Sequence, residues 1–568
     1  MKHLIKNQHD KNIRSIAYFS MEIGLKDTIP TFSGGLGVLA GDTLKSFADL
    51  VVPIVGVTLL SRNGYFRQEI IDGVQKEFPE EWDPAQVMTL MPQKVVIMIE
   101  GRDVVVQAWK YKHKGVKDFE VPIFFLDTNV EENHEEDKEI TNQLYGGDQR
   151  YRIKQEAVLG IAGVRILEAL GYNGIDKYHM NEGHSAFLTL ELLRRTENLD
   201  ENDFNKKYDT KLVKELCAFT THTPVPAGHD QFEVSDYEQI VGRDFIDNDF
   251  MKRFYYGDKI NMTHLALNNS NHINGVAVKH AQVSQDMFPG YPIDSITNGV
   301  HSLTWTSDEF QDLFDKHIPG WRHDQFNLRY AISISRKEIW EAHSAAKKKL
   351  IETVNTQYKT QFKDDVFTIG FARRSTLYKR PYLLFSDIER LKTIAAKVGK
   401  IQIIYAGKAH PSDGGGKDMI KKIFDTKKLL SDNIELVYLS NYNMKVAKIL
   451  ISGVDIWLNT PRKPMEASGT SGMKASHNAV PNFSVLDGWW LEGHIENVTG
   501  WSIGHKNESS DEEDAEDLYV KLAEIILPMY YHEWDKWTEI MKYAIAFNAS
   551  FFNTNRMVHQ YVLNSYFH

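Results

Sequence analysis

Short apolar segments alternate with segments of helical periodicity along almost the whole chain. Residues 15–20, SIAYFS, favour a buried strand, and residues 151–170 place apolar side chains at helical spacing. The segments 177–181, KYHMN, and 217–228, CAFTTHTPVPAG, each favour a strand that ends in a loop. This alternation is typical of α/β proteins with parallel sheets.

A second series of the same kind follows residues 296–305, ITNGVHSLTW. It begins with a long polar helix around 335–355, and its expected strands lie at 366–372, 401–407, 434–439 and 454–458. Two such series predict an α/β fold of two doubly wound, Rossmann-like domains, 1–300 and 301–568, that face each other across a cleft. Ligands in such sheets bind beyond the carboxyl ends of the strands. We expect the last ~20 residues to form a helix that crosses back to the first domain.

Composition narrows the class of protein. A chain of 568 residues is too long for one compact core, and 42% hydrophobic with 25% charged residues is typical of a soluble enzyme. No apolar run is long enough to cross a bilayer. The single cysteine, Cys217, cannot form an internal disulfide, which fits the cytoplasm. A net charge of −11 argues against nucleic acid or an anionic membrane as a partner.

A glycine-rich segment, Ser33–Gly37, comes after the first expected strand and, as part of the loop FSGGLGVLAGD, leads into the helical LKSFADL. It formally contains a dinucleotide fingerprint, but no acidic residue sits where a ribose would be held. Glycines at a helix start expose N–H groups that suit a phosphate oxygen. The alternative is a tight turn that needs glycine only for its conformation.

Four cations follow the expected strand 366–372: Arg373, Arg374, Lys379 and Arg380. They cannot all be buried without an anionic partner, and arginine and lysine together suit a phosphate. In an acidic chain this is the best candidate phosphate site, although an exposed basic helix start would look the same. The acidic run 507–519 favours a solvated helix start.

Histidines also lie on loops that follow expected strands: His179, His184 and His222. The spacing His179-x-x-Glu182-x-His184 matches no standard zinc site, so we expect no metal. Hydrogen bonds to sugar hydroxyls and a purely structural role both remain open for these side chains. No G-x-S-x-G segment supports a serine hydrolase.

The segment Glu466–Lys474, EASGTSGMK, combines a carboxylate, hydroxyls, small residues and one lysine. Backbone N–H groups in such a run tend to converge on an anion. A lysine beside a phosphate-binding loop indicates a nucleotide site or an aldehyde cofactor held as a Schiff base, and the string does not fit the nucleotide-hydrolase loop. A small-residue loop with a solvated lysine is the alternative.

Taken together, YFSMEIGL, SGGLGVLAGD, EASGTSGMK and DGWW resemble the α-glucan phosphorylases, colinearly over most of the chain. The resemblance is to the compact prokaryotic form of this glycogen, starch and maltodextrin phosphorylase family, without the extension that carries phosphorylation and nucleotide control. It implies the B-type glycosyltransferase architecture, pyridoxal phosphate as cofactor and a homodimer. It also implies a hexosyltransferase in which inorganic phosphate releases α-glucose 1-phosphate, with retained configuration, from the non-reducing ends of an α-1,4-glucan such as glycogen or maltodextrin.

The resemblance also implies roles for single residues. Lys474 would form the Schiff base. The cofactor phosphate and its surroundings would involve Thr470, Ser471, Tyr442, Arg373 and Trp305. The substrate phosphate would be held by Arg374, Lys379 and the N–H of Gly35, with Glu22 near that loop. The glucose hydroxyls would be bound by Glu466, Ser468, Gly469, His222 and Asn298. Asn443 departs from the animal enzymes, which carry arginine there.

The implied mechanism is physically reasonable. Two phosphates held together raise each other's proton affinity, so one can stay protonated near neutral pH and act as an acid on the leaving glucosyl oxygen. No carboxylate nucleophile is needed, unlike in the two-carboxylate hydrolases.

Two other functions remain open at this point. A sugar-nucleotide-dependent retaining glycosyltransferase of the same fold often has two glutamates eight positions apart, whereas here Glu466 is followed at that distance by Lys474. A catalytically silent carbohydrate-binding protein would have little use for so many costly charges.

Overall fold

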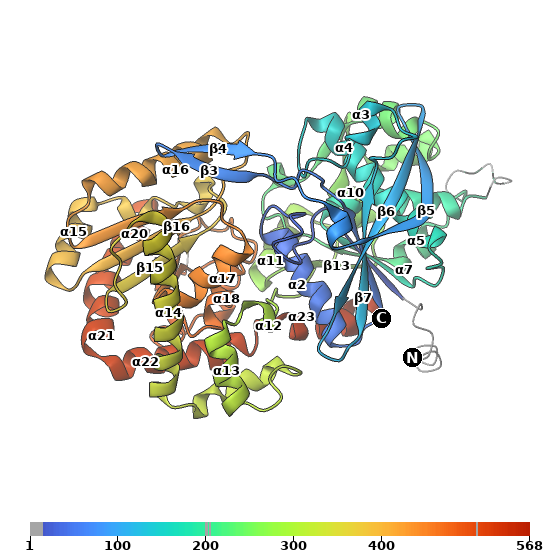
Figure 1. Ribbon diagram of the computed structural model, residues 1–568. Coiled ribbons are helices and arrows are strands. Elements are labelled where there is room, and N and C mark those ends of the chain that lie inside the picture. The colour runs from blue at the N-terminus through green and yellow to red at the C-terminus, as the bar shows by residue number, and fades with distance from the viewer. Residues whose placement is uncertain (1–14, 199–200, 202, 204–205, 507–508, 568) are drawn as a thin grey trace.

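The computed structural model describes residues 15–198, 201, 203, 206–506 and 509–567, which form a mixed α/β fold with two large sheets (Figure 1). In the described chain the first sheet has the order β14-β13-β9-β8-β1-β2-β7-β6-β5. Neighbouring strands pair in parallel from β14 to β7, and β6 and β5 add an antiparallel edge. Its strands are β1 (Ile16–Ser20), β2 (Ile54–Leu59), β5 (Thr89–Ile99), β6 (Arg102–Lys114), β7 (Glu120–Asp127), β8 (Lys177–Asn181), β9 (Cys217–Thr220), β13 (His272–Gly275) and β14 (Asp294–Ser295).

The second sheet is parallel throughout, in the order β17-β16-β15-β18-β19-β20. Its strands are β15 (Phe367–Ala372), β16 (Ile401–Ala406), β17 (Ile434–Leu439), β18 (Ile456–Asn459), β19 (Asn482–Val485) and β20 (Gly500–Ile503). Two smaller sheets pair β3 (Arg67–Ile71) with β4 (Val74–Phe78), and β12 (Lys259–Asn261) with β10 (Gln231–Glu233) and β11 (Tyr255–Tyr256).

Helices connect the strands and cover the sheets. Those associated with the first sheet are α2 (Gly35–Asp49), α3 (Glu135–Lys138), α4 (Gln149–Ala157), α5 (Gly163–Ala169), α6 (Phe187–Arg195), α7 (Thr210–Leu216), α8 (Val234–Tyr237), α9 (Asn248–Met251), α10 (Met262–Asn268) and α11 (Val278–Met287). Those that follow are α12 (Ser302–Trp305), α13 (Asp308–His317), α14 (Arg336–Tyr358), α15 (Ile388–Lys397), α16 (Gly414–Thr426), α17 (Met444–Gly453), α18 (Ser471–Ser476), α19 (Trp490–Gly493), α20 (Asp511–Lys521), α21 (Leu527–His532), α22 (Trp534–Tyr543) and α23 (Thr554–Tyr561). No helix in the described ranges has both the length and the apolar character that a membrane crossing requires.

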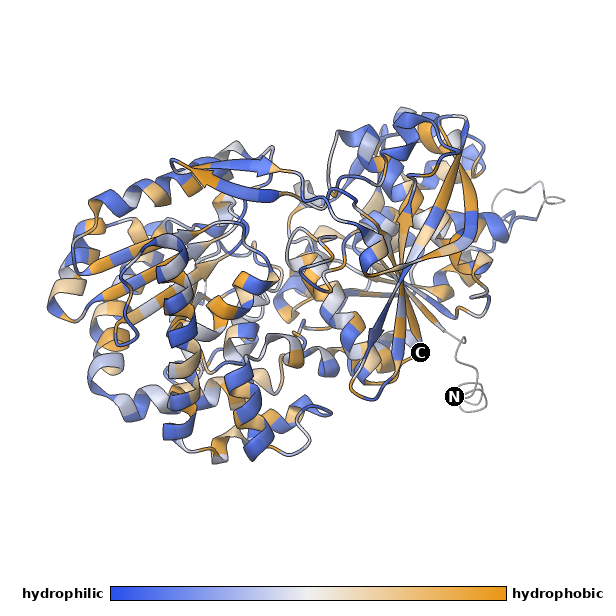
Figure 2. Cartoon of the chain, in the orientation of Figure 1, coloured by the Kyte–Doolittle hydropathy of each residue, from blue (hydrophilic) through white to orange (hydrophobic). Residues whose placement is uncertain are grey.

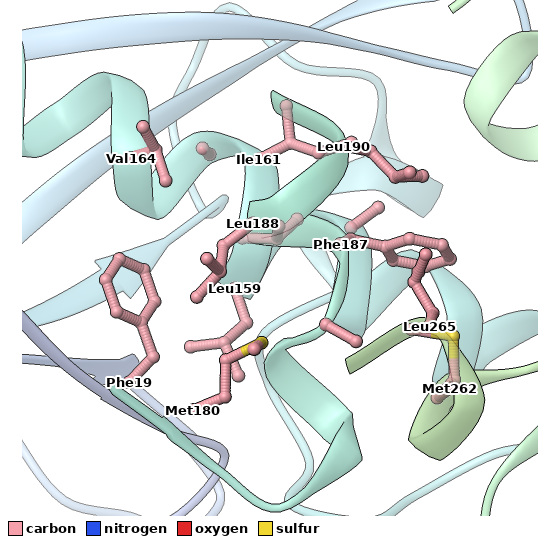
Figure 3. Packing of buried hydrophobic residues seen from close by; sticks show 14 of the residues in the cluster. Phe19, Leu159, Ile161, Val164, Met180, Phe187, Leu188, Leu190, Met262 and Leu265 are labelled. Atoms are coloured by element: carbon pink, nitrogen blue, oxygen red, sulfur yellow. The ribbon is translucent and has the colours of Figure 1, made fainter. Parts of the chain in front are cut away.

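Each sheet has its own hydrophobic core. Figure 2 shows hydrophobic residues concentrated on the strands of both sheets. In the first core, Phe19 of β1 and Met180 of β8 pack against Leu159 and Val164 of the helical segment 149–169 (Figure 3). A separate core joins residues of the second sheet to α20, α21 and α22. The alternate residues Ile16 and Tyr18 of β1, and Ile404 and Ala406 of β16, belong to two further clusters, so both faces of each parallel sheet are buried, as the continuous apolar runs of the sequence predict.

Most expected elements are confirmed. The segment FSGGLGVLAGD, which we expected to be a loop as far as Asp42, is the exception. The helix α2 already begins at Gly35. Its glycines serve close packing: a Cβ on Gly41 would lie 1.9 Å from the carbonyl oxygen of Gly24, and one on Gly37 would lie 2.6 Å from Glu22 Oε2. Glycine is therefore needed inside this helix because backbone and carboxylate approach it closely.

Two segments cross between the sheets. The hairpin β3–β4 leaves the first sheet and lies beside α16 (Figure 1), where Gln68 Nε2 donates to the carbonyl oxygen of Gly407 at 2.9 Å and Gln75 Nε2 to that of Ala409 at 2.9 Å. In the other direction α23 packs on α2, where the Ser46 and Thr554 hydroxyls lie 2.6 Å apart. The relative position of the two sheets is thus fixed by buried polar contacts.

Candidate active site

The start of α2 is surrounded by polar groups from several elements. The buried carboxylate of Glu22 accepts hydrogen bonds from the backbone N–H of Ser33 at 2.5 Å and of Gly34 at 3.3 Å, and from the Tyr145 hydroxyl at 3.1 Å. A Cβ built on Gly35 would meet no heavy atom within 4 Å, so this residue faces open space. Glu22 thus satisfies the first amides of the segment and leaves the side of Gly35 accessible to a ligand.

The four cations after β15 divide into two groups. Arg374 is exposed, and its Nη2 atom donates to the Ser33 hydroxyl at 3.3 Å, so it lies against the glycine-rich segment of the other sheet. Arg373 and Lys379 are the second group, and both contact Glu466 Oε2, at 2.6 and 2.7 Å. Three cations from one loop therefore stand beside the start of α2 and the EASGTSGMK segment.

The fourth cation, Arg380, does not join them. Its guanidinium is buried, contacts Asp514 at 2.6 Å and Asp511 at 2.9 Å, and donates to the carbonyl oxygens of Thr460 and Pro461. Arg380 is therefore removed from the phosphate candidates, because all three of its guanidinium nitrogens already donate to these groups. The acidic run does begin a helix at Asp511, as expected, although residues 507–508 lie outside the described residues.

Glu466 is the anionic centre of this cluster. Its side chain is buried, which alone would raise its pKa, but Arg373 and Lys379 hold the pKa at about 2. The backbone N–H of Glu466 donates to Asp487 Oδ2 at 2.8 Å, and burial raises the pKa of Asp487 to about 6. The cluster keeps Glu466 ionised at neutral pH, as a hydrogen-bond acceptor for hydroxyl groups.

Replacing Glu466 by glutamine is expected to lower the free energy of unfolding by about 3 kcal/mol at pH 7, because two buried cations lose their counter-ion. The folded-state pKa is depressed, so this contribution is complete above the ordinary glutamate pKa of 4.5 and disappears as pH falls toward about 2. Urea unfolding of both proteins between pH 7 and pH 3 measures it. A difference that stays constant over this range would contradict the ion-pair explanation.

Lys474 lies in the short helix α18, within a nearly closed environment. Its side chain is 8% exposed, and its Nζ atom lies 3.8 Å from the ring centre of Trp305. Burial lowers the pKa of the amine to about 8, although the charge of Asp42 opposes this shift. At neutral pH the lysine therefore has an appreciable neutral fraction, which is the form that attacks an aldehyde.

The residues around Lys474 suit an aldehyde cofactor that carries a phosphate. The Thr470 side chain makes no capping hydrogen bond to α18, and the Ser471 hydroxyl accepts a bond from Trp457 at 3.0 Å. Tyr442 packs against the same hydrophobic cluster as Trp305, and burial raises its pKa, so it stays a neutral donor. A reactive buried amine, two hydroxyl groups at the start of α18 and Arg373, whose charge acts on Tyr442, together fit pyridoxal phosphate.

The structure explains the asparagine at position 443. Asn443 is the N-cap of α17, and its Oδ1 atom accepts a hydrogen bond from the backbone N–H of Val446 at 2.9 Å. The backbone N–H of Lys445 donates to Asp27 of the other sheet at 3.0 Å. At this position the side chain therefore completes a helix start.

Replacing Asn443 by alanine is expected to lower the free energy of unfolding by about 1 kcal/mol, the usual value of an N-cap. Asn443→Asp, which keeps an acceptor oxygen, should lie close to the natural protein. Chemical denaturation of the three proteins provides the measurement, and an alanine variant as stable as the aspartate variant would refute the capping role.

The residues expected to contact sugar are placed in two groups. Ser468 and Asn298 are buried, and in the described part of the chain Ser468 Oγ and Asn298 Oδ1 have no hydrogen-bond partner. Gly469 adopts φ +76°, a conformation that favours glycine, beside the Glu466 side chain. His222 Nε2 lies 2.7 Å from Asn181 Oδ1, and burial lowers its pKa to about 4, so the imidazole is neutral. These buried polar atoms are available to hydrogen-bond a polar ligand.

The contacts of the other two histidines, His179 and His184, lie within the protein. His179 is buried and bonds Tyr566 at 2.6 Å and Thr220 at 2.9 Å, which is a structural role. His184 contacts Asp230 at 3.3 Å. Sequence reasoning did not single out the half-buried Tyr145 or the buried Asp42 and Asp487, three polar residues next to the expected site. Asp42 and Asp487 lie in the quoted segments SGGLGVLAGD and DGWW, so the sequence offered a signal for these two, whereas nothing marked Tyr145.

Known proteins match this chain over most of its length. The family described as carbohydrate phosphorylase matches residues 30–130 and 249–500. A maltodextrin phosphorylase of Thermococcus litoralis is 37% identical, over 96% of this chain and 70% of its own length. Glycogen phosphorylases of Mycobacterium tuberculosis and Aquifex aeolicus are each 34% identical over 97% of this chain, and over 70% and 86% of their own lengths.

Proposed function

Because this chain belongs to the carbohydrate phosphorylase family, we propose that it is an α-glucan phosphorylase with pyridoxal phosphate on Lys474. The reaction transfers a glucosyl unit from the non-reducing end of the glucan to inorganic phosphate and retains its configuration. The observation that carries the proposal is the contact between Arg374 and Ser33 at 3.3 Å, which joins the cations of one sheet to the glycine-rich segment of the other.

In this proposal Arg374, Lys379 and the N–H of Gly35 bind the substrate phosphate. Arg374 is exposed and Gly35 faces open space, so both are accessible to an anion. Lys379 is buried and supplies a fixed charge on the other side. A phosphate held this way exchanges its hydration shell for donors in fixed positions, which orients it for attack on the sugar.

The sugar would lie beside the EASGTSGMK segment. Glu466, Ser468 and Gly469 provide an ionised carboxylate, a hydroxyl without a partner and a backbone close to the ligand, while His222 and Asn298 stand on the side of the first sheet. Arg373, Thr470, Ser471 and Tyr442 would hold the cofactor phosphate, with Trp305 beside the lysine. Bound there, pyridoxal phosphate would supply a second phosphate group beside the substrate phosphate, where the two would raise each other's proton affinity.

The finer architecture belongs to the same proposal. We place a domain boundary near residue 300 and a cleft between two doubly wound domains, in the B-type glycosyltransferase arrangement. This is supported by two separate hydrophobic cores and by site residues that come from both sheets. We also propose a homodimer and a cytoplasmic location.

The decisive experiment incubates the purified protein with maltodextrin and inorganic phosphate and measures glucose 1-phosphate. Product that requires both substrates supports the proposal. The same protein with maltodextrin and nucleoside diphosphate glucose tests the sugar-nucleotide alternative. Chain extension by the nucleotide sugar without phosphorolysis would overturn the proposal, and so would no product with saturating pyridoxal phosphate, which would favour a silent carbohydrate-binding protein.

A further inference from the structure

Asp42 is a fully buried carboxylate whose two oxygens differ in their surroundings. Its side chain is 1% exposed. Oδ2 accepts hydrogen bonds from the backbone N–H of His301 at 3.1 Å and from Trp305 Nε1 at 2.6 Å. Oδ1 has no hydrogen-bond partner among the described residues. The charge on this oxygen is therefore balanced by nearby cations rather than by a hydrogen bond.

One buried lysine, Lys45, adjoins this carboxylate, and a second, Lys474, is linked to it through Trp305. Lys45 Nζ lies 3.9 Å from Asp42 Oδ1 and donates a hydrogen bond to Thr304 at 3.1 Å. Lys474 Nζ stacks on the face of Trp305, the same indole whose N–H binds Asp42. Within the described residues, Lys474 Nζ has neither a hydrogen bond nor an ion pair. The Trp305 indole thus connects Lys474 to Asp42, and Asp42 is the carboxylate whose charge acts on Lys474.

We propose that Asp42 is the counter-ion of the Lys474 nitrogen. Asp42 favours the protonated form of this nitrogen and Lys45 favours the neutral form, so together they set the pH range in which Lys474 reacts with the cofactor. Asp42 is a positioning residue in this sense, because it acts through the lysine. The inference rests on the proposed role of Lys474 as the cofactor-bearing residue and adds to it the two side chains that control its reactivity.

The charges near Lys474 support these opposite effects. Burial lowers its pKa to about 8, the negative charge of Asp42 raises it, and the positive charge of Lys45 lowers it. His477, on the same helix, has a pKa that burial lowers to about 4, so it is neutral. His301 directs its ring to Asp49, at 2.9 Å. Lys45 itself has a pKa lowered to about 8 by burial and, further out, is influenced by Lys448, Asp27 and Lys26.

The covalent step makes this control measurable. The neutral Lys474 amine attacks the aldehyde carbon of pyridoxal phosphate, the new C–N bond forms, and the aldehyde oxygen leaves as water. A protonated amine has no lone pair for this attack, so the rate should rise with pH through the pKa of the lysine. A change in the charge near Lys474 therefore shifts the midpoint of the curve of reaction rate against pH.

The test uses the full chain freed of cofactor and mixed with pyridoxal phosphate between pH 6 and pH 10. Borohydride traps the product at set times, and peptide mapping counts the label on Lys474. Asp42→Asn is expected to move the midpoint down by about one pH unit, as loss of a nearby opposite charge does. Lys45→Met is expected to move it up by a similar amount.

Asp49→Asn is the matched control, since Asp49 is a buried carboxylate on the same helix that binds His301 rather than Trp305. Its midpoint should equal that of the natural protein. A midpoint unchanged in Asp42→Asn, or shifted equally in Asp49→Asn, overturns the inference. If Asp42→Asn does not fold, Lys45→Met decides, and a midpoint that fails to rise overturns it. No label on Lys474 in the natural protein would instead refute the proposed function.

Discussion

Replacing Lys379 by alanine is expected to lower kcat/KM for phosphate by about 10²–10³-fold, which is the cost of losing one preorganised donor to a reacting oxyanion. The lysine is buried 2.7 Å from Glu466 and supplies a fixed positive charge on the phosphate side of the proposed site. The cofactor should stay attached, because Lys474 and the residues around it are unchanged. Initial rates of glucose 1-phosphate release against phosphate concentration provide the measurement.

Lys428→Ala serves as the control, because that lysine is exposed and pairs only with Asp425 within the described chain. It should behave like the natural protein. A Lys379→Ala variant with the natural kcat/KM for phosphate would remove Lys379 from the proposed phosphate site. If the variant also loses the cofactor, Lys379 maintains the structure of the site rather than binding phosphate.

Replacing Lys474 by alanine is expected to abolish the adduct that borohydride traps and to lower phosphorolysis by at least about 100-fold, because a cofactor that is not anchored loses its alignment. Its amine is the buried one on the EASGTSGMK segment and stacks on Trp305. Peptide mapping of reduced protein and a glucose 1-phosphate assay of the same preparation measure both effects.

Lys474→Arg tests whether charge alone is sufficient, since arginine keeps a cation but cannot form the Schiff base. It should behave like the alanine variant. A trapped adduct on another lysine in either variant, with full activity, would show that the EASGTSGMK segment does not carry the cofactor.

The sequence predicted the secondary structure well where periodicity is strong. The runs 366–372, 401–407 and 434–439 became the strands β15, β16 and β17 within one residue at each end. The antiparallel edge strands β5 and β6 were not expected. The alternation of strands and helices along the sequence predicts parallel strands joined by helices, and β5, β6 and β7 are not joined in that way. The hairpin β3–β4 was missed for a similar reason, since its buried residues are glutamines that bond across to the other sheet.

Local sequence motifs identified the candidate site residues, and the tertiary structure decided which of them contact each other. The sequence placed four cations in one loop, but only the fold shows that Arg380 turns to Asp514, 134 residues away along the chain, while Lys379 turns to Glu466. Likewise, only the fold shows that Asn443 caps a helix. Neighbours that are distant in sequence leave no pattern in a single chain, because their choice depends on how whole elements pack.

By itself, the sequence determined the alternation of strand-like and helix-like segments that builds the two sheets. It also determined the motifs that resemble those of the phosphorylases. Both are written in residues that are close along the chain, where side-chain period and loop composition act directly. The tertiary structure alone decided which charges are compensated, that Glu22 accepts hydrogen bonds from the amides of Ser33 and Gly34 just before α2, and that Asp42 lies beside Lys45 and is linked through Trp305 to Lys474. Those features depend on burial, and burial exists only once the elements have packed together.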